Sequence, residues 1–173
     1  MTKLLRTASA AATAAALALT ASPAFAQAVS PDRNATATAR VVKPLTLTWV
    51  RDLDLGTIVL SGAGAWSGAV VGITRAGSFN CTNANTTCSG ATQTAQYRVT
   101  GTNNQTVTVT APSFNLTGPG GATLPFTVDG PGTVNLSNSG ATGLVFDLGG
   151  SISVSSTTPD GTYTGTFNVT VNY

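Results

Sequence analysis

The sequence predicts an all-β protein: an immunoglobulin-like β-sandwich of antiparallel strands after a cleaved N-terminal signal peptide. Three observations lead to this prediction. Short segments that alternate apolar with Thr, Ser or Asn side chains recur through the chain, and a period of two is that of a half-buried strand. Clusters of Gly, Pro, Asn and Asp separate these segments as turns do. Beyond the first 26 residues no segment has a helical period, so many short strands with frequent turns indicate a sandwich.

The first 26 residues have the parts of a secretory signal peptide. Lys3 and Arg6 precede an apolar run at 8–21, and an A-x-A cleavage site ends at Ala26. Removing these 26 of the 173 residues leaves 147, at positions 27–173, which is enough for one domain with its own core. We therefore expect one exported domain, in the periplasm, at the cell surface or outside the cell, with no membrane span after cleavage.

The charge of residues 27–173 is sparse and balanced. Six Lys and Arg accompany six Asp, and there is no His or Glu. No basic stripe is present to neutralise phosphates, which argues against nucleic-acid binding. Asp52 and Asp54 could share a strand face as a carboxylate pair or Ca²⁺ site, but a solvated strand end is the favoured interpretation. Without a nucleophile motif, phosphate loop or metal spacing, we expect no enzyme and no cofactor.

The first strand region spans residues 35–49. Pro44 cannot donate a hydrogen bond to a neighbouring strand, so it divides the region into two parts. The large apolar residues after it are expected in the core of this domain: Leu45, Leu47 and Trp49. The apolar residues before it are small and suit a narrow groove, on a neighbouring chain or on the edge of their own sheet: Ala35, Ala37, Ala39 and Val41.

The middle of the chain predicts a series of shorter strands. They lie at 58–60, 69–73, 97–99 and 107–110, with briefer pieces at 114–116, 124–128 and 134–136. The glycine-rich loop after the first of them carries Trp66, a candidate for stacking on a sugar, although a loop tryptophan more often fills a gap in the core. Asn103-Asn104 is expected to form a hairpin turn.

Cys81 and Cys88 are the two cysteines of the chain. In an exported protein they are expected to form a disulfide with each other. A zinc site would need two further ligands, and the sequence has no His. Because the cysteines are close in sequence, we expect the bond to pin a surface loop without holding the two sheets together.

The last fifteen residues have the clearest strand pattern. A turn at 159–161 is followed by apolar odd positions and by Thr or Asn at even positions. A second alternating segment lies at 144–154, and we expect the two segments to pair as a terminal hairpin. The apolar side chains expected to be buried are these: Tyr163, Phe167, Val169 and Val171.

Residues 145–154 and 161–173, together with 52–58, resemble a bacterial secreted domain-of-unknown-function family that is itself similar to spore coat protein U-type and fimbrial (chaperone-usher) pilin domains. The resemblance covers most of residues 35–173. It implies an immunoglobulin-like fold that lacks one strand, which the N-terminal strand of a neighbouring subunit fills. It places that donor strand within residues 27–43, at Ala35 to Val41. It also implies a periplasmic chaperone and an usher, with the chaperone holding a C-terminal strand made of these residues: Gly161, Tyr163, Gly165, Phe167, Val169, Val171 and Tyr173.

Three functions follow as alternatives. The favoured one is a non-enzymatic structural subunit of a bacterial surface fibre, assembled by β-strand addition to other subunits of the same or a related fibre. The second is a self-contained secreted β-sandwich that binds glycan or matrix through its loops, with Trp66 as the first candidate. The third and least favoured is an outer-membrane β-barrel, because an aromatic C-terminus after alternating apolar residues also suits the last strand of a barrel.

Overall fold

The computed structural model describes residues 29–30, 32–137 and 142–173. The predicted signal peptide at 1–26 lies outside the described residues. The chain divides into two compact units, Met1–Ala39 and Arg40–Tyr173. The described residues of the first unit form no helix or strand and are exposed. All the strands among the described residues belong to the second unit.

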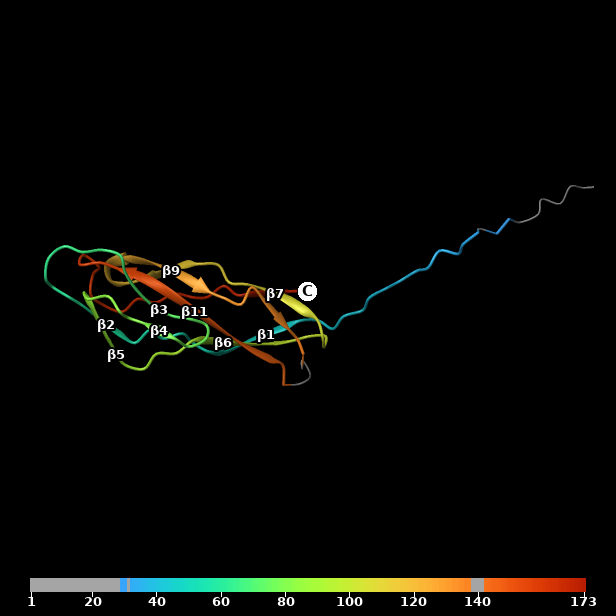
Figure 1. Cartoon of the computed structure of the whole chain (residues 1–173), viewed down its shortest axis with the longest axis horizontal. Helices are drawn as coiled ribbons and strands as arrows, with labels where there is room; N and C mark the ends of the chain where they lie inside the picture. Colours follow the sequence, from blue (N-terminus) through green and yellow to red (C-terminus); the bar gives the residue numbers. More distant parts are fainter. Residues whose placement is uncertain (1–28, 31, 138–141) are drawn as a thin grey trace, which may run out of the picture. The chain divides into compact units, whose positions relative to one another are not determined.

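The second unit is built from short antiparallel strands (Figure 1). Within the described residues they alternate with turns, and a three-residue 3₁₀ turn is the one helical element. No helix in this part of the chain is long and apolar enough to cross a membrane. The elements are β1 (Thr46–Arg51), β2 (Thr57–Leu60), β3 (Ala69–Ile73), β4 (Phe79–Asn80), β5 (Thr86–Ser89), β6 (Ala95–Thr100), β7 (Thr106–Thr110), β8 (Phe114–Thr117), η1 (Pro119–Gly121), β9 (Thr123–Asp129), β10 (Thr133–Asn135), β11 (Leu144–Val154) and β12 (Thr170–Asn172). The protein is therefore all-β, as the sequence predicts.

Strand β11 is the centre of the larger sheet. Its first half pairs with β6, and its second half pairs with both β3 and β9. Strands β1, β4 and β8 extend this sheet beyond β6, β3 and β9 respectively, which gives seven strands. Two smaller sheets, β10-β7-β12 and β2-β5, complete the second unit.

Two glycines allow β11 to change partners at its midpoint. A Cβ atom on Gly150 would lie 2.3 Å from the ring of Phe126, and one on Gly149 would lie 2.2 Å from the carbonyl oxygen of Ile73. Real side chains do not tolerate such distances, so only glycine lets the neighbouring strand and the aromatic ring approach this closely.

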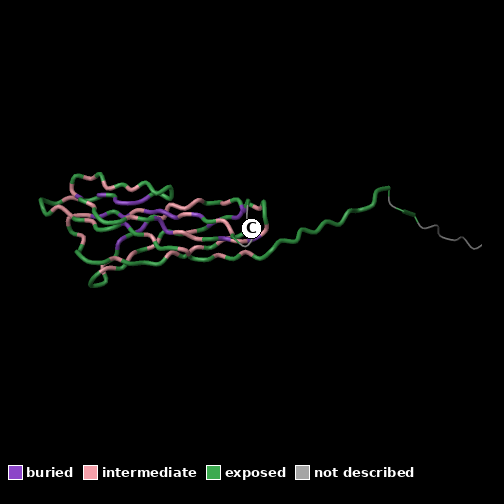
Figure 2. The backbone as a smooth tube through the Cα atoms, turned by 90° about the horizontal axis from the view of Figure 1, so that it is seen from below, coloured by how far each residue is buried: buried purple, intermediate pink, exposed green. Residues whose placement is uncertain are grey.

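The core consists of two apolar clusters. The backbone of buried residues, purple in Figure 2, runs through the interior of the second unit. The first cluster lies where the sheet β10-β7-β12 covers the large sheet, and we call this part the closed half. The buried members of this closed-half cluster are Ala95, Val99, Val107, Val109, Leu136, Phe146 and Leu148. The open-half cluster lies at the other end of β11, and its buried members are Leu55, Ala69, Val71, Ile73, Leu124, Phe126, Ile152 and Val154. Leu53 and Phe167 contact both clusters, so the core is continuous.

The predicted terminal hairpin is wrong. Strand β12 pairs with β7, and Thr164 forms an isolated bridge with Thr117, whereas β11 has no pairing with residues 161–173 in the described structure. The physical reason is that β3 and β9 already occupy both edges of the second half of β11. The end of the chain instead joins β7 of the opposite layer at 170–172, and Thr164 bridges Thr117 of β8.

The predicted hairpin at Asn103-Asn104 is also wrong, although the turn itself is present. Asn104 has a φ of 58°, a conformation that asparagine tolerates better than most residues. The strands on either side of the turn do not pair, because β6 belongs to the large sheet and β7 to the sheet opposite. The turn is thus a corner between the two layers.

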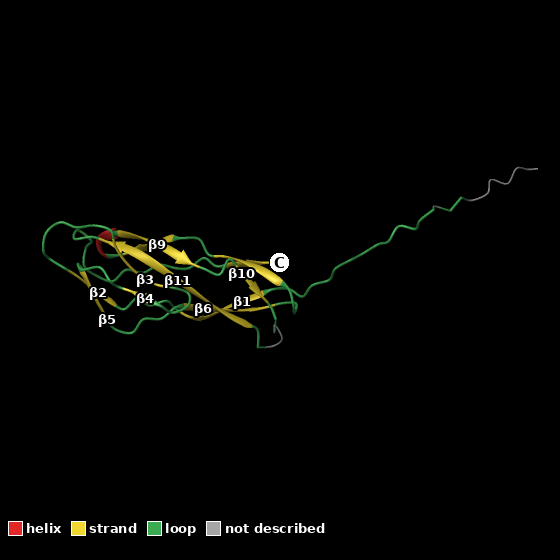
Figure 3. Cartoon of the chain, in the orientation of Figure 1, coloured by secondary structure: helices red, strands yellow, loops and turns green. Residues whose placement is uncertain are grey.

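The N-terminal strand is shorter than the sequence pattern suggests. Residues 32–45 form no strand (Figure 3), and β1 begins at Thr46. Leu45 and Leu47 contact the core as predicted. The prediction for Trp49 is wrong, since its side chain is 58% exposed. A register shift between Trp49 and Arg51 interrupts the alternation there, as a β-bulge does.

Candidate functional site

A groove of about 1130 Å³ opens in the open half of the second unit. One wall is the segment 52–62, which includes β2, and the other wall is the C-terminal segment 156–165 with Phe167. Strands β8, β9 and β11 supply the floor. The floor residues are apolar: Phe114, Leu116, Leu124, Phe126, Ile152 and Val154.

The groove is a gap in the layer that faces the large sheet. On one wall, β2 pairs with β5 along one edge, and Asp54 bridges Gln93 on that same side. On the other wall, residues 165–169 form no strand. Upstream of them, the described wall residues are held by the bridge between Thr164 and Thr117 and by the bond from the backbone N–H of Ser156 to the carbonyl oxygen of Trp66. The wall edges that face the groove therefore offer backbone groups without strand partners.

The floor of the groove is closely packed. The ring of Phe126 lies 5.1 Å from that of Phe114 and 5.6 Å from that of Phe167, measured between centroids. Gly165 lets the wall lie against this cluster, because a Cβ atom there would be 2.6 Å from the Phe114 ring. A strand that enters the groove would therefore need small side chains on its inner face.

The apolar alternation of the C-terminal segment is as predicted, with partial burial. Tyr163, Phe167, Val169 and Val171 are half-buried and contact the core, while the Thr and Asn residues between them are exposed. Two of the predicted strand residues serve turns and wall contacts instead: Gly161 has a φ of 139°, and Gly165 lies on the Phe114 ring.

Tyr173 fastens the start of β1 to the rest of the second unit. Its hydroxyl donates to the carbonyl oxygen of Lys43 at 2.5 Å and accepts from the backbone N–H of Thr102 at 2.8 Å. The backbone N–H of Lys43 also donates to Thr102 Oγ1 at 2.7 Å. Lys43, three residues before β1, is thus held at the closed half of the second unit.

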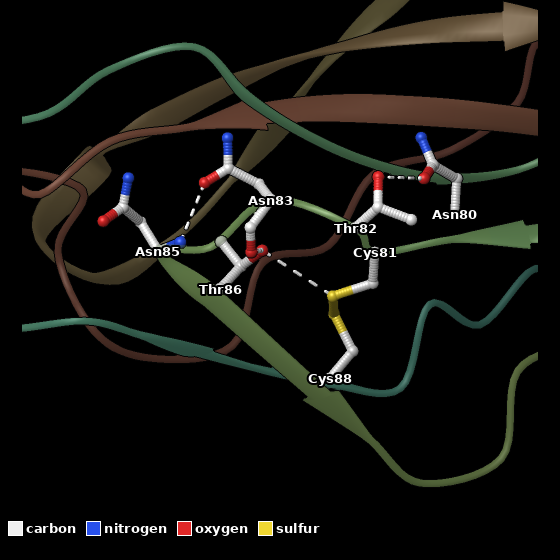
Figure 4. The surroundings of a disulfide bond; sticks show 7 residues. All are labelled: Asn80, Cys81, Thr82, Asn83, Asn85, Thr86 and Cys88. Atoms are coloured by element: carbon white, nitrogen blue, oxygen red, sulfur yellow. Dashed lines mark hydrogen bonds between the residues drawn. A yellow bond between two sulfur atoms is a disulfide. The ribbon is translucent and has the colours of Figure 1, made fainter.

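Cys81 and Cys88 form a disulfide behind the β2 wall (Figure 4), with their Cα atoms 6.2 Å apart. The expectation that it pins only a surface loop is wrong. Cys81 directly follows β4 of the large sheet, and Cys88 lies on β5 opposite Ile58 of the groove wall. Because the chain crosses between the two sheets within this short loop, the bond ties one sheet to the other.

Trp66, the candidate for stacking on a sugar, is half-buried and contacts the open-half cluster. Its indole N–H donates to the carbonyl oxygen of Ser61 at 3.1 Å, and its backbone N–H donates to Ser156 Oγ at 3.2 Å. These contacts anchor the glycine-rich loop to the C-terminal segment. They favour a packing role for Trp66.

The rim of the groove is acidic. Asp52, Asp54 and Asp160 line it, and none of the described lining residues is Lys or Arg. Asp52 accepts a hydrogen bond from the indole N–H of Trp49 at 3.0 Å, and Asp54 accepts one from the backbone N–H of Gly56 at 2.8 Å. Within the described ranges, no three His, Cys, Asp or Glu residues are arranged to hold a metal ion.

These observations define an all-β domain with an open groove in one layer. The family described as a domain of unknown function, DUF4402, matches residues 45–173, and the chain belongs to this family. The match runs from the residue before β1 to the C-terminus, so it includes the floor and both walls of the groove but not residues 35–41. No curated protein and no solved structure matches the chain. The prediction of such a family is confirmed; its similarity to spore coat and pilin domains stays a prediction.

Proposed function

We propose that this protein is a non-enzymatic structural subunit of an exported fibre, in which the N-terminal strand of one copy fills the groove of the next. The observation that supports this function is the gap itself, with an apolar floor and unpaired strand edges on both walls. In β-strand addition, the backbone supplies hydrogen bonds to such edges, and alternate side chains enter apolar pockets.

The segment we assign as the donor is residues 35–41. Its odd positions are Ala or Val and its even positions are Thr or Arg, so one strand face would be apolar and the other polar. Small side chains match a floor that is already closely packed. In the first unit and at the start of the second, these residues form no strand of their own and are exposed.

Chain length favours a neighbouring copy over the donor of the same chain. Lys43 lies beside Thr102, and the near end of the groove follows Arg51, which lies opposite Gln96. Six residues of extended chain separate Gln96 from Thr102, which is roughly 20 Å. Val41 is two residues from Lys43 and can reach only about 7 Å from it. Most of the donor segment is therefore too close in sequence to Lys43 to reach its own groove.

The partners in this proposal are further copies of the chain or subunits of a related fibre, together with a periplasmic chaperone and an usher. A chaperone would cover the open edges of the groove before a donor strand arrives, since such edges promote unwanted association. The disulfide is compatible with an oxidising, exported location. In the glycan-binding alternative Trp66 stays the first candidate, although its indole N–H already donates to the carbonyl oxygen of Ser61.

The test of this function is the assembly state of the exported chain with and without residues 27–42. We expect the full chain to form SDS-resistant ladders and the deletion variant to remain a folded, non-assembling domain. Ala37→Asp should abolish assembly by placing a charge on the apolar face, whereas the matched Thr38→Asp should not. A full chain that stays monomeric, or a deletion variant that still forms ladders, would show that the proposed function is wrong.

A further inference from the structure

We propose that the groove and the N-terminal segment are matched in charge, so that the groove selects the segment of a second copy of this chain and the association weakens with salt. This inference rests on the proposed function. It adds the force that attracts the donor segment and the reason why the groove selects another copy of this chain.

The groove holds half of the acidic residues of positions 27–173 and none of the basic ones. The carboxylates of Asp52, Asp54 and Asp160 line it and are exposed. The hydrogen bonds that Asp52 and Asp54 accept come from neutral N–H groups. Arg51, the nearest base in sequence, pairs instead with Asp147 at 3.0 Å. The three negative charges therefore have no basic partner among the described residues.

The N-terminal segment has the opposite charge. Residues 29–43 contain Arg33, Arg40 and Lys43 with a single acid, Asp32, which gives a net charge of +2. A chain that is neutral over positions 27–173 thus separates +2 on residues 29–43 from −3 around the groove. Opposite potentials of this kind steer association and exclude wrong partners.

The alternation of the segment places Arg40 at the mouth of the groove, while Arg33 and Lys43 flank the apolar stretch between them. With Ala37, Ala39 and Val41 facing the floor, Arg40 faces outward. Asp54 is exposed and lies between Leu53 and Leu55, whose side chains point inward. Its carboxylate therefore faces the mouth of the groove, as Arg40 of a bound donor would. Carboxylates lie on both walls of the groove, and bases flank the donor segment on both sides. These pairs would be partly solvated, and their effect should be on rate and selectivity.

The experiment measures the rate of assembly of the full exported chain by light scattering, in about 20 mM and about 500 mM NaCl. One variant carries Arg33→Glu with Arg40→Glu, and a second carries Asp54→Lys with Asp160→Lys. At low salt we expect each variant alone to assemble at least about tenfold more slowly than the parent. A chain with all four substitutions should regain most of the rate, and high salt should remove the differences. Arg98→Glu, which changes an exposed base away from the groove, is the control and should assemble like the parent.

Parent-like rates for the charge variants at low salt, with Ala37→Asp still inactive, would overturn the electrostatic match and leave strand addition standing. Parent-like assembly of Ala37→Asp would instead overturn the proposed function, and the charge match with it. Circular dichroism of each variant before assembly establishes that a slow rate is not the result of unfolding.

Discussion

The two halves of the sandwich differ in how the second layer is completed. In the closed half, β10, β7 and β12 pair with one another and cover the large sheet, and five of the seven buried core residues there have no exposed surface: Ala95, Val99, Val107, Leu136 and Leu148. In the open half, β2 and the C-terminal segment leave a groove between them. Both halves have an apolar cluster, so a lack of apolar residues does not explain the opening.

The difference lies in the backbone. The alternation of apolar and polar residues is equally regular at 163–169 and at 170–172, yet only the latter segment forms a strand, because β7 lies beside it. The C-terminal segment at the groove has Thr117 as its single bridge partner. A strand-like sequence thus becomes a strand only where another edge is available.

The largest expected effect contrasts a core residue of the closed half with a wall residue of the open half. Leu148→Ala should lower the free energy of unfolding by about 2–5 kcal/mol, because Leu148 is fully buried. Leu60→Ala should cost less than half as much, since Leu60 is half-buried at the groove. Denaturant titration measures both, and equal losses would contradict the contrast between the halves.

Removal of the disulfide should affect the open half selectively. Replacing Cys81 and Cys88 with Ser should cost about 2.5 kcal/mol, on the chain-entropy account of so short a loop. Because the bond holds β5 behind the β2 wall, hydrogen exchange should accelerate in β2 and β5. Unchanged protection there, or an equal loss in β7, would contradict this assignment.

A single methyl group tests the close approach of the groove wall to its floor. Gly165→Ala should destabilise the protein by about 1–3 kcal/mol, because the added Cβ atom meets the Phe114 ring. Gly62→Ala is the matched control, since nothing lies within 4 Å of a Cβ atom at that position. Thermal unfolding of both variants decides whether the wall is packed as described.

The hydroxyl of Tyr173 holds Lys43 at the closed half. Tyr173→Phe removes its hydrogen bonds to Lys43 and Thr102 and should cost about 1 kcal/mol. Tyr163→Phe in the open half removes one bond, to the carbonyl oxygen of Pro159, and should cost less. A larger loss of stability for Tyr163→Phe than for Tyr173→Phe would contradict this expectation.

The smallest effect is a pH dependence in the closed half. Burial, and then the negative charge of Asp52, raise the pKa of Tyr97 above its ordinary value. Since the folded-state pKa is the higher one, the neutral phenol stabilises the fold below the unfolded pKa, and this contribution is lost as pH rises through the folded pKa. Ultraviolet titration should show one tyrosine ionising after the others. Tyr97→Phe should reduce the loss of stability at alkaline pH.

The sequence by itself determined the all-β class, most strand positions, the faces of the C-terminal segment and the pairing of the cysteines. These features depend on short-range properties: the two-residue period of a strand, the conformations of Gly, Pro and Asn, and the chemistry of two nearby thiols. They appear in the structure close to where the pattern places them, as at β3, β6, β7 and β9.

Only the tertiary structure decided which strands are neighbours. It moved the C-terminal segment from β11 to β7, turned Asn103-Asn104 into a corner between layers, and made the disulfide a link between sheets. It also left Trp49 exposed beside a bulge. The physical reason is that alternation specifies the face of a strand but not its partner. The partner depends on which edges remain unoccupied after distant parts of the chain have packed.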